Sequence, residues 1–370
     1  MKLSVLRENL HKGVSRATRI ISTRPQIPIL ASLLLAATDE GLQIVSSSLE
    51  TTEKTSVSAK VDKEGGLCVP ARVLAELVSS LPQDTVLLEE KEKHLVVSCG
   101  GVKATIAGID SGEFPPAVVI SEKGKMAAEK EILVKALSLV LFAAATDEGR
   151  PLLTGVKLTQ KKENTVLAAT DGYRLSVYSL SLGFLDKTDT VIPARALLEL
   201  VRVCQEEKET KEVAFFPVVD GQLCIRMGDT EIITRQVDGQ YPNYEKIIPT
   251  KHTTSTTVDT QELLRAVRSA SIFARDSANV VRFHINKKSL TVSANAPQLG
   301  ESAVEIDAKI MGEDGGDIAF NSRFLIDLLG VFPGDEVVLE TTGSLNPGVF
   351  LSPKDPAFLH VIMPVRVQGG

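Results

Sequence analysis

Four side chains with binding chemistry surround one predicted turn. Asp171-Gly172 stands between two alternating apolar runs, which is typical of a β-hairpin tip. The side chains around it supply a hydroxyl, an aromatic face, a guanidinium and an aliphatic group, from Thr170, Tyr173, Arg174 and Leu175. Surfaces that bind peptides combine apolar anchors with a few oriented polar groups of this kind. The segment therefore predicts either an ordinary hairpin tip or a peptide site built on one.

Length and composition restrict what the chain can be. Its 370 residues are enough for two or three domains that each bury a core. No apolar run is long enough to span a membrane, and charge interrupts the N-terminus too early for a secretory signal. We therefore expect a cytoplasmic protein with no membrane partner.

The metal-ligating residue types form no recognisable site. Five histidines are scattered, and no C-x-x-C spacing occurs among Cys68, Cys99, Cys204 and Cys224, which we expect to be free thiols. We therefore expect no metal and no cofactor. The net charge of −6 argues against tight nucleic-acid binding over the whole surface, but it allows a basic stripe on one face.

A threefold repeat is visible in the sequence. The segments 69–72, 192–195 and 320–323 each precede a similar apolar run, at offsets of 123 and 128 residues. The matching arginines are Arg72, Arg195 and Arg323, and the matching acids four residues later are Glu76, Glu199 and Asp327. A second register matches Pro115, Pro242 and Pro364. We predict three copies of one domain, at residues 1–124, 125–250 and 251–370.

Each copy is predicted to be an α+β domain with two helices against antiparallel strands. The opening helix of the first copy is predicted from apolar spacing at Leu6, Leu10, Val14 and Ala17. A second helix should start after Pro70 and stop at Pro82, with one apolar face formed by Val73, Leu74, Leu77, Val78 and Leu81. Alternating runs predict strands at residues 42–45, 55–61, 85–88, 95–98 and 104–107.

Basic residues recur on the predicted helices. The first opening helix carries Lys12, Arg16 and Arg19, the third carries Arg265, Arg268 and Arg275, and the second carries only Lys135. These charges fit ordinary solvated helix faces. They also fit a surface complementary to phosphate, if the repeats place their helices on one side.

At these residues the chain resembles a known family, the bacterial DNA polymerase III beta subunit, or replicative sliding clamp. The matching segments are R-P-x-x-P-I-L at 24–30, V-P-A-R at 69–72, A-T-D-G-Y-R-L at 169–175, Y-P-N-Y at 241–244 and V-I-M-P-V-R at 361–366. The resemblance covers the whole chain. It implies a head-to-tail homodimer that forms a six-domain ring, with helices lining the hole, and no catalytic activity of its own.

The resemblance also implies partners and a peptide-binding groove. The partners are encircled double-stranded DNA without sequence preference, a second copy of the chain, the polymerase III catalytic subunit, the clamp loader and other proteins with a clamp-binding motif. The groove would accept an extended peptide with a glutamine and two large apolar residues downstream. Its residues would be Leu153, Thr170, Gly172, Tyr173, Arg174, Leu175, Pro242, Lys246, Ile247, Val361, Ile362, Met363, Pro364, Val365 and Arg366. Leu153, Leu175, Pro242 and Met363 would hold the apolar anchors, and Thr170 and Arg174 would orient polar groups.

For the other two partners the resemblance implies shorter sets of residues. DNA would face Arg24, Arg72, Lys103, Arg195 and Arg202. The subunit contact would use Ile272 and Phe273, although Ala104 stands where the family can have a large aromatic residue.

Two alternative functions stay open. One is a repeat scaffold that binds only proteins, which would be indifferent to loss of the basic residues. The other is a nucleic-acid-processing enzyme, for which the sequence offers no phosphate loop and no recurring carboxylate pair with metal-binding spacing.

Overall fold

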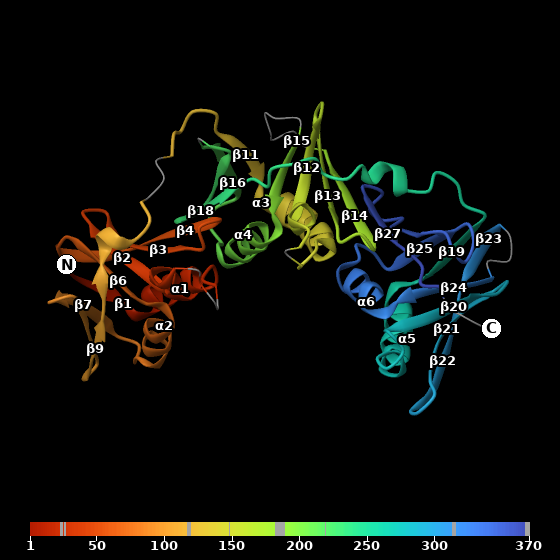
Figure 1. Ribbon diagram of the computed structural model, residues 1–370, viewed down its shortest axis with the longest axis horizontal. Coiled ribbons are helices and arrows are strands. Elements are labelled where there is room, and N and C mark those ends of the chain that lie inside the picture. Colours follow the sequence, from red (N-terminus) through yellow and green to blue (C-terminus); the bar gives the residue numbers. More distant parts are fainter. Residues whose placement is uncertain are drawn as a thin grey trace. The chain divides into compact units, whose positions relative to one another are not determined.

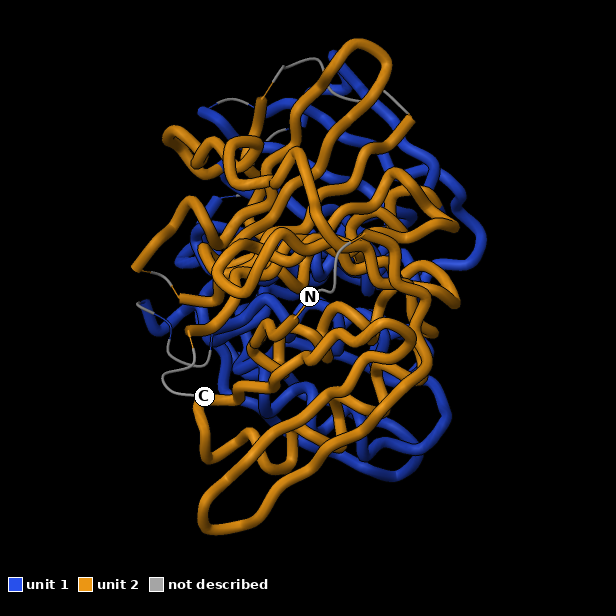
Figure 2. The backbone as a smooth tube through the Cα atoms, turned by 90° about the vertical axis from the view of Figure 1, so that its right-hand side faces the viewer, with its two compact units in different colours: residues 1–131, 195–236 blue, residues 132–194, 237–370 orange. Residues whose placement is uncertain are grey.

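The computed structural model (Figure 1) describes residues 1–22, 25, 27–116, 120–147, 149–181, 189–218, 220–312 and 316–366. These residues form two compact units (Figure 2). The first unit contains residues 1–131 and 195–236, and the second contains residues 132–194 and 237–370. The middle third of the chain therefore contributes elements to both units.

The three repeats share one order of elements: a strand, a helix, a run of strands, a second helix and a last set of strands (Figure 1). The first repeat contains β1 (Lys2–Leu6), α1 (Arg7–Thr18), β2 (Ser32–Thr38), β3 (Gly41–Ser47), β4 (Thr51–Val57), β5 (Ala59–Lys63), β6 (Gly65–Pro70), α2 (Ala71–Ser80), β7 (Thr85–Lys91), β8 (His94–Cys99), β9 (Val102–Ala107) and β10 (Ile109–Asp110). The second contains β11 (Met126–Glu129), α3 (Lys130–Val140), β12 (Gly155–Lys161), β13 (Asn164–Thr170), β14 (Arg174–Leu180), β15 (Asp189–Pro193), α4 (Ala194–Glu206), β16 (Glu212–Pro217), β17 (Gln222–Met227) and β18 (Thr230–Arg235). The third contains β19 (Thr254–Asp259), α5 (Thr260–Ala274), β20 (Val280–Ile285), β21 (Ser289–Ala296), β22 (Gly300–Asp307), β23 (Lys309–Gly312), β24 (Gly316–Asn321), α6 (Ser322–Val331), β25 (Glu336–Thr341), β26 (Gly348–Leu351) and β27 (Phe358–Ile362).

A short strand, rather than a helix, opens each repeat. β1, β11 and β19 each end at the residue before α1, α3 and α5 begin. Leu6, predicted on the first helix, is instead the last residue of β1, and its side chain is exposed. Leu10, Val14 and Ala17 are buried on α1 as predicted. The sequence pattern did not separate β1 from α1, because Leu6 continues the apolar spacing of the helix.

The second helix of the first repeat has nearly its predicted bounds. α2 begins directly after Pro70 and ends before Pro82, which cannot continue a helix. Leu74 and Val78 are buried. Val73 was predicted on the same apolar face, but it is 50% exposed, because it lies one position round the helix from Leu74.

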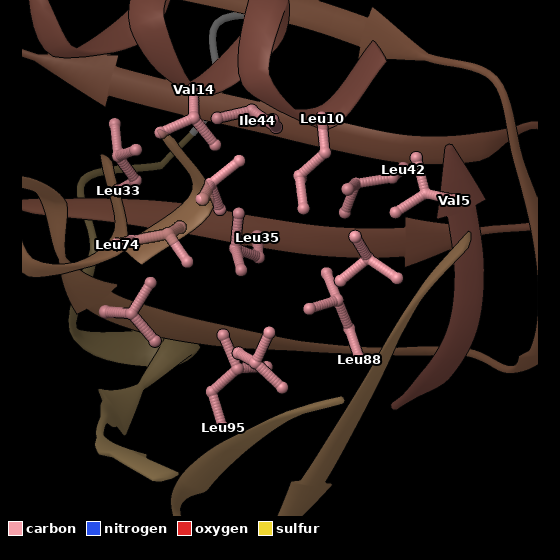
Figure 3. Packing of buried hydrophobic residues seen from close by; sticks show 14 of the residues in the cluster. Val5, Leu10, Val14, Leu33, Leu35, Leu42, Ile44, Leu74, Leu88 and Leu95 are labelled. Carbon is pink, nitrogen blue, oxygen red and sulfur yellow. The ribbon is translucent and has the colours of Figure 1, made fainter. Parts of the chain in front are cut away.

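The core of the first unit holds α1 and α2 against its sheets. Figure 3 shows this packing, which joins side chains of α1 and α2 to side chains of β1, β2, β3, β7 and β8, including Val5, Leu10, Val14, Leu33, Leu35, Leu42, Ile44, Leu74, Leu88 and Leu95. Burial of each such side chain contributes about 1.5–3 kcal/mol relative to exposure. One face of each helix is thereby fixed inward.

Sheets continue from one repeat into the next within each unit. The first unit contains a nine-stranded sheet in the order β10-β6-β2-β3-β4-β18-β17-β16-β11. The second unit contains another, in the order β15-β12-β13-β14-β27-β26-β25-β19-β23. The joints between repeats are the antiparallel pairs β4–β18 and β14–β27. Thr55 lies opposite Thr230 at the first joint. Tyr178 follows Thr55 by 123 positions and Phe358 follows Thr230 by 128 positions, and these two residues lie opposite each other at the second joint. The two joints therefore have the same register.

Two strands that match the joint strands stand at sheet edges. β9 ends the five-stranded sheet β5-β1-β7-β8-β9 of the first unit, and it matches β18 and β27 in the order of its repeat. β22 ends the four-stranded sheet β22-β21-β20-β24 of the second unit, and it matches β4 and β14. Among the described residues, no further strand pairs with the outer edge of either.

Candidate functional site

The predicted hairpin is present, and its own side chains fix the turn. β13 and β14 are paired up to Thr170 and Leu175. The Asp171 Oδ1 atom accepts hydrogen bonds from the backbone N–H groups of Tyr173 (2.9 Å) and Arg174 (3.0 Å). The Thr170 hydroxyl donates to the Arg174 carbonyl oxygen (2.6 Å) and accepts from the Gly172 N–H (3.0 Å). Gly172 has a φ of +92°, which favours glycine.

The C-terminal segment lies beside this turn. β27 pairs with β14 in the sheet, with Arg174 opposite Ile362. Past the end of β27, the Met363 N–H donates to the Tyr173 carbonyl oxygen (2.9 Å), and the Val365 N–H donates to the Ala319 carbonyl oxygen on β24 (2.8 Å). Residues 363–365 are therefore held between the turn of the second repeat and a strand of the third.

An apolar cluster underlies the turn and the C-terminal segment. It brings together residues from distant parts of the second unit, namely Ala145, Leu153, Ala168, Leu175, Val191, Tyr241, Tyr244, Val349 and Val361. Leu175 is completely buried, whereas Met363 is 39% exposed. The exposed apolar side chains of the predicted site are Tyr173, Ile247 and Met363. Leu153, Leu175 and Val361 thus form a supporting layer, and the exposed residues form its accessible surface.

The predicted groove residues come from three segments, and the structure places most of them in this region. Pro242, Lys246 and Ile247 are exposed, on and beside the short 3-10 turn Tyr244–Ile247. Ile362 is buried, and Pro364 and Val365 are half-buried. Arg366 instead lines a separate hollow over β20 and β21, beside Arg282 and Asn295.

Arg150, which no sequence pattern marks as a site residue, also lies at the turn. Its Nη1 atom is 2.9 Å from the position that a Cβ atom would take on Gly172. Any side chain at position 172 would therefore displace this guanidinium. Arg150 follows the acidic segment 146–149 in a different loop, so no local sequence pattern links it to the hairpin.

A serine and a histidine meet under the turn, but they are not accessible to a substrate. The Ser176 Oγ and His360 Nδ1 atoms are 2.6 Å apart, and both side chains are fully buried. Burial, together with the charge of Arg174, lowers the pKa of His360 to about 3, so the ring is neutral at physiological pH. The ring stacks on Phe142 and Phe358. These contacts indicate a structural pair rather than a nucleophile and its base.

Three of the residues predicted to face DNA lie on second helices in the first unit. Arg72 on α2 is 91% exposed in its side chain and pairs with Glu76 (3.1 Å). Arg195 and Arg202 are exposed on α4, and Arg202 pairs with Glu199 (3.3 Å). Arg24 lies outside the described residues.

Lys103 is not on a helix. It lies on the edge strand β9 opposite Ser98 of β8, whose neighbours Val97 and Cys99 face the core. Because side chains alternate along a strand, Lys103 points to the side of the sheet away from that core.

The basic face expected on α1 is largely engaged in ion pairs. Arg16 is buried and donates to Glu206 on α4 (2.6 Å) and to Thr230 (3.1 Å). Arg19 binds Glu199 and Glu206, each at 2.8 Å. The expectation that Arg16 belongs to a solvated basic stripe was therefore wrong, because its side chain is buried between two repeats. Arg19 also joins the two repeats but stays partly exposed, as does Lys12.

The residues expected at the subunit contact lie at the end of α5. Ile272 is 55% exposed, and Phe273 is half-buried. The Phe273 ring lies 3.8 Å from the position of a Cβ atom on Gly300, the first residue of the edge strand β22. An exposed apolar residue therefore stands next to an unpaired sheet edge.

No metal site or membrane span is found in the part of the chain that the structure describes. No cluster of three or more His, Cys, Asp or Glu side chains there could hold a metal ion. No helix within those residues has the length and apolar character needed to cross a membrane.

Comparisons with known proteins agree over the whole length. Three models of DNA polymerase III beta subunit domains match in order: the N-terminal domain at residues 1–119, the central domain at 127–243 and the C-terminal domain at 245–366. The beta sliding clamp of Synechococcus elongatus is 30% identical and that of Bacillus subtilis 27% identical, with at least 99% of each chain covered.

Solved structures show the same similarity. The DNA polymerase sliding clamp of Bacillus subtilis matches with a TM-score of 0.90 at 27% identity over 99% of each chain. The sliding clamp of Bartonella birtlesii, solved with griselimycin bound, matches with a TM-score of 0.93 at 25% identity over 99% of this chain and 100% of that one. With these matches along its whole length, the chain belongs to the DNA polymerase III beta subunit family, the non-catalytic sliding clamps of DNA replication.

Proposed function

We propose that this chain works as a head-to-tail homodimer that encircles duplex DNA and tethers replication proteins through the predicted peptide site. Its three domains would be residues 1–124, 125–250 and 251–370. Two observations carry the proposal. The two joints between repeats pair their strands in the same register, and the matching strands β9 and β22 each stand at the edge of a sheet. If β22 of one chain pairs with β9 of another, the same joint is made a third time. Two such contacts between two chains leave no joint strand unpaired, which is the condition for a closed ring.

The register of the two existing joints supports this pairing through charge. Lys54 lies opposite Glu231 at the first joint. The matching positions in β22 and β9 follow from the neighbouring strands. Lys54 pairs with the fifth residue of β3, and Ala303 pairs with the fifth residue of β21. Glu231 pairs with the fifth residue of β17, and Lys103 pairs with the fifth residue of β8. Pairing in this register places Lys103 opposite the partner's Ala303 and, on the same face of the sheet, diagonally next to Glu301 and Glu305. We therefore assign Lys103 to the subunit contact in preference to DNA.

The helices beside the joints support the same contact. At the second joint the Arg174 guanidinium lies over the rings of both Phe142 and Phe324. Counted from the helix starts, Ile272 matches Phe142, and Val73 matches Phe324. Ile272 is 55% exposed and Val73 is 50% exposed. Their mutual burial across the subunit contact would explain why two large apolar side chains are exposed in one chain.

DNA is held in this proposal by enclosure rather than by strong contacts. Arg72 and Arg195 stand at matching positions on α2 and α4, both exposed, and Arg202 follows on α4. The chain carries a net charge of −6, so the field far from these helices repels DNA. A few phosphate contacts give weak, sequence-independent binding, which a sliding protein needs.

Peptide partners would dock where the turn at 170–175, the linker at 242–247 and the C-terminal segment meet. Exposed apolar side chains over a buried supporting layer, next to the Arg150 guanidinium, suit an extended peptide with two large apolar residues and a polar one. The polymerase III catalytic subunit, the clamp loader and other clamp-binding proteins are the proposed partners, in the cytoplasm.

Sedimentation equilibrium tests the dimer on which this function depends. We expect a mass of about 80 kDa, twice the 39.8 kDa of one chain, at micromolar concentration. The Ile272→Asp variant should sediment as a folded monomer, because a charge would be buried without a partner. Met311→Asp, which changes an exposed residue on β23, is the control and should leave the dimer intact. A monomeric wild-type protein would contradict the proposal.

A further inference from the structure

An acid at one repeat position joins each later repeat to the one before it. Glu199 on α4 binds Arg19, which follows α1 of the first repeat, at 2.8 Å. Asp327, at the same position on α6, binds Arg174 of the second repeat at 2.7 Å. The basic partners come from different elements, but the acid and the direction of the contact are the same. The threefold match of Glu76, Glu199 and Asp327 in the sequence therefore has a structural meaning at both joints.

The second of these contacts involves a residue of the predicted peptide site. The Arg174 Nε atom donates to Asp171 Oδ2 (3.0 Å), and its Nη1 atom donates to Asp327 Oδ2 (2.7 Å). The guanidinium carbon lies 4.6 Å from the ring centre of Phe324 and 5.5 Å from that of Phe142. The side chain is only 10% exposed. The Nε and Nη1 donors of Arg174 are thus committed to two carboxylates, and the guanidinium contacts two aromatic rings.

We propose that Arg174 is a positioning residue, which sets peptide affinity by latching the 171–174 turn to α6 through Asp327 and not by binding the peptide. This inference rests on the peptide site proposed above and changes the role of one of its members. It makes a helix of the third repeat, far from the turn in sequence, a determinant of the peptide site in the second.

The backbone contacts show how the latch would act on the site. The Tyr173 carbonyl oxygen, one residue before Arg174, accepts the Met363 N–H, and Val365 is bonded to β24, which leads directly into α6. The turn therefore contacts the C-terminal segment through Met363, that segment contacts β24 before α6, and α6 contacts the turn through Asp327. When the Arg174–Asp327 bond is lost, the turn is free to shift relative to Met363, and the spacing of the exposed apolar side chains changes. Lysine cannot reproduce these contacts, because they need two separately directed donors on one planar group that also lies against aromatic rings.

Peptide titration against four variants tests the latch. The probe is a fluorescently labelled peptide with a glutamine and two large apolar residues downstream, measured by anisotropy with the dimeric full-length protein. Asp327→Asn should lower affinity by roughly fivefold or more, the lower end of typical coupling between sites. Arg174→Lys should lower it by a similar factor, and the double variant should lose no more than either single one, because both remove the same bond. Asp327→Glu, which keeps the carboxylate, should restore most of the affinity.

The outcomes separate this inference from the proposed function. Asp317→Asn is the matched control, since Asp317 is an exposed acid of the third repeat whose partner is His284, and it should bind like the wild type. If Asp327→Asn unfolds, Phe324→Leu removes one of the two rings that contact the guanidinium, leaves the ion pair in place and should still weaken binding. If the wild-type protein binds the peptide and Asp327→Asn binds it with the same affinity, the latch is wrong but the proposed peptide site stands. If the wild-type protein binds no such peptide, the proposed site itself is wrong.

Discussion

The Thr55 and Thr230 hydroxyl groups lie 3.3 Å apart, opposite each other across the joint between the first and second repeats. The matching residues at the next joint are Tyr178 and Phe358. One register therefore carries two different chemistries. The first joint is lined by threonines and by the ion pairs of Arg16 and Arg19, whereas the second combines the Arg174–Asp327 ion pair with aromatic and aliphatic side chains. The first joint also holds a buried carboxyl group, that of Glu53, and should therefore respond to pH more than the second.

Glu53 makes the first joint sensitive to pH. Its side chain is fully buried, and its Oε2 atom has no hydrogen-bond partner among the described residues. Burial, and then the charge of Glu199, raises its pKa from 4.5 to about 8. Because the folded protein holds this proton more tightly than the unfolded chain, the stability that Glu53 contributes is complete below about pH 4.5 and is lost as pH rises to about 8.

Replacement of Glu53 by glutamine should remove this dependence. Glu53→Gln keeps a neutral side chain of the same shape, so its unfolding free energy relative to the wild type should rise with pH, by at most about 1.4 kcal/mol per unit between pH 5 and 8. Urea unfolding at several pH values measures the difference. Glu245→Gln is the control, because a hydrogen bond from Lys161 lowers the pKa of Glu245 and leaves no titration in this range. Parallel pH profiles for Glu53→Gln and wild type would rule out a buried proton.

Two of the four apolar residues predicted as peptide anchors should behave differently from each other. Leu175 is completely buried, so Leu175→Ala should lower the unfolding free energy by about 2–5 kcal/mol through the cavity it leaves. Met363 is partly exposed, so Met363→Ala should leave stability nearly unchanged but weaken peptide binding by about 2 kcal/mol if it is a hot spot. Calorimetric titration and thermal unfolding measure the two effects. Met311→Ala, an exposed methionine on β23, should change neither; a peptide affinity insensitive to Met363→Ala would remove Met363 from the site.

The subunit contact should depend on the charge of Lys103. Lys103→Glu would place three acids together in the proposed register and should raise the dimer dissociation constant by about tenfold or more, which corresponds to 1.4 kcal/mol. Combining it with Glu301→Lys and Glu305→Lys should restore the dimer. Lys93→Glu, in the turn between β7 and β8, is the control on the same sheet. Sedimentation velocity at low and high salt measures all four proteins, and a failure of the reversed charges to rescue would reject the register.

Much of the fold could be predicted from local pattern. The repeat, the second helices and the hairpin at Asp171-Gly172 follow from apolar spacing and from turn residues, which act over a few positions. The opening strand of the first repeat could not be predicted, because Leu6 fits the spacing of α1 equally well. The domain boundaries remain predictions, since the compact units divide the second repeat between them.

The roles of charged residues were harder to predict, because they depend on partners that are distant in sequence. Arg16 and Arg19 carry the helical spacing of a solvated face, yet Glu206 and Glu199 lie nearly two hundred positions away and engage both. The sequence predicts Arg174 as a peptide contact, because nothing in it shows that Asp327 and Phe324 lie beside the guanidinium. The residues of the peptide site could be predicted as one group mainly because the family resemblance links three segments that no local pattern connects.

The most direct test of the account is whether the protein holds DNA by enclosing it. The dimer would carry a charge of about −12, twice that of one chain, so weak electrostatic contacts alone cannot retain it on DNA in high salt. Protein loaded by the ATP-driven clamp loader onto a nicked circular duplex should remain bound through gel filtration in high salt, and a single cut that linearises the circle should release it. Equal retention on linear DNA with free ends, or efficient loading onto circles without the loader, would contradict the account.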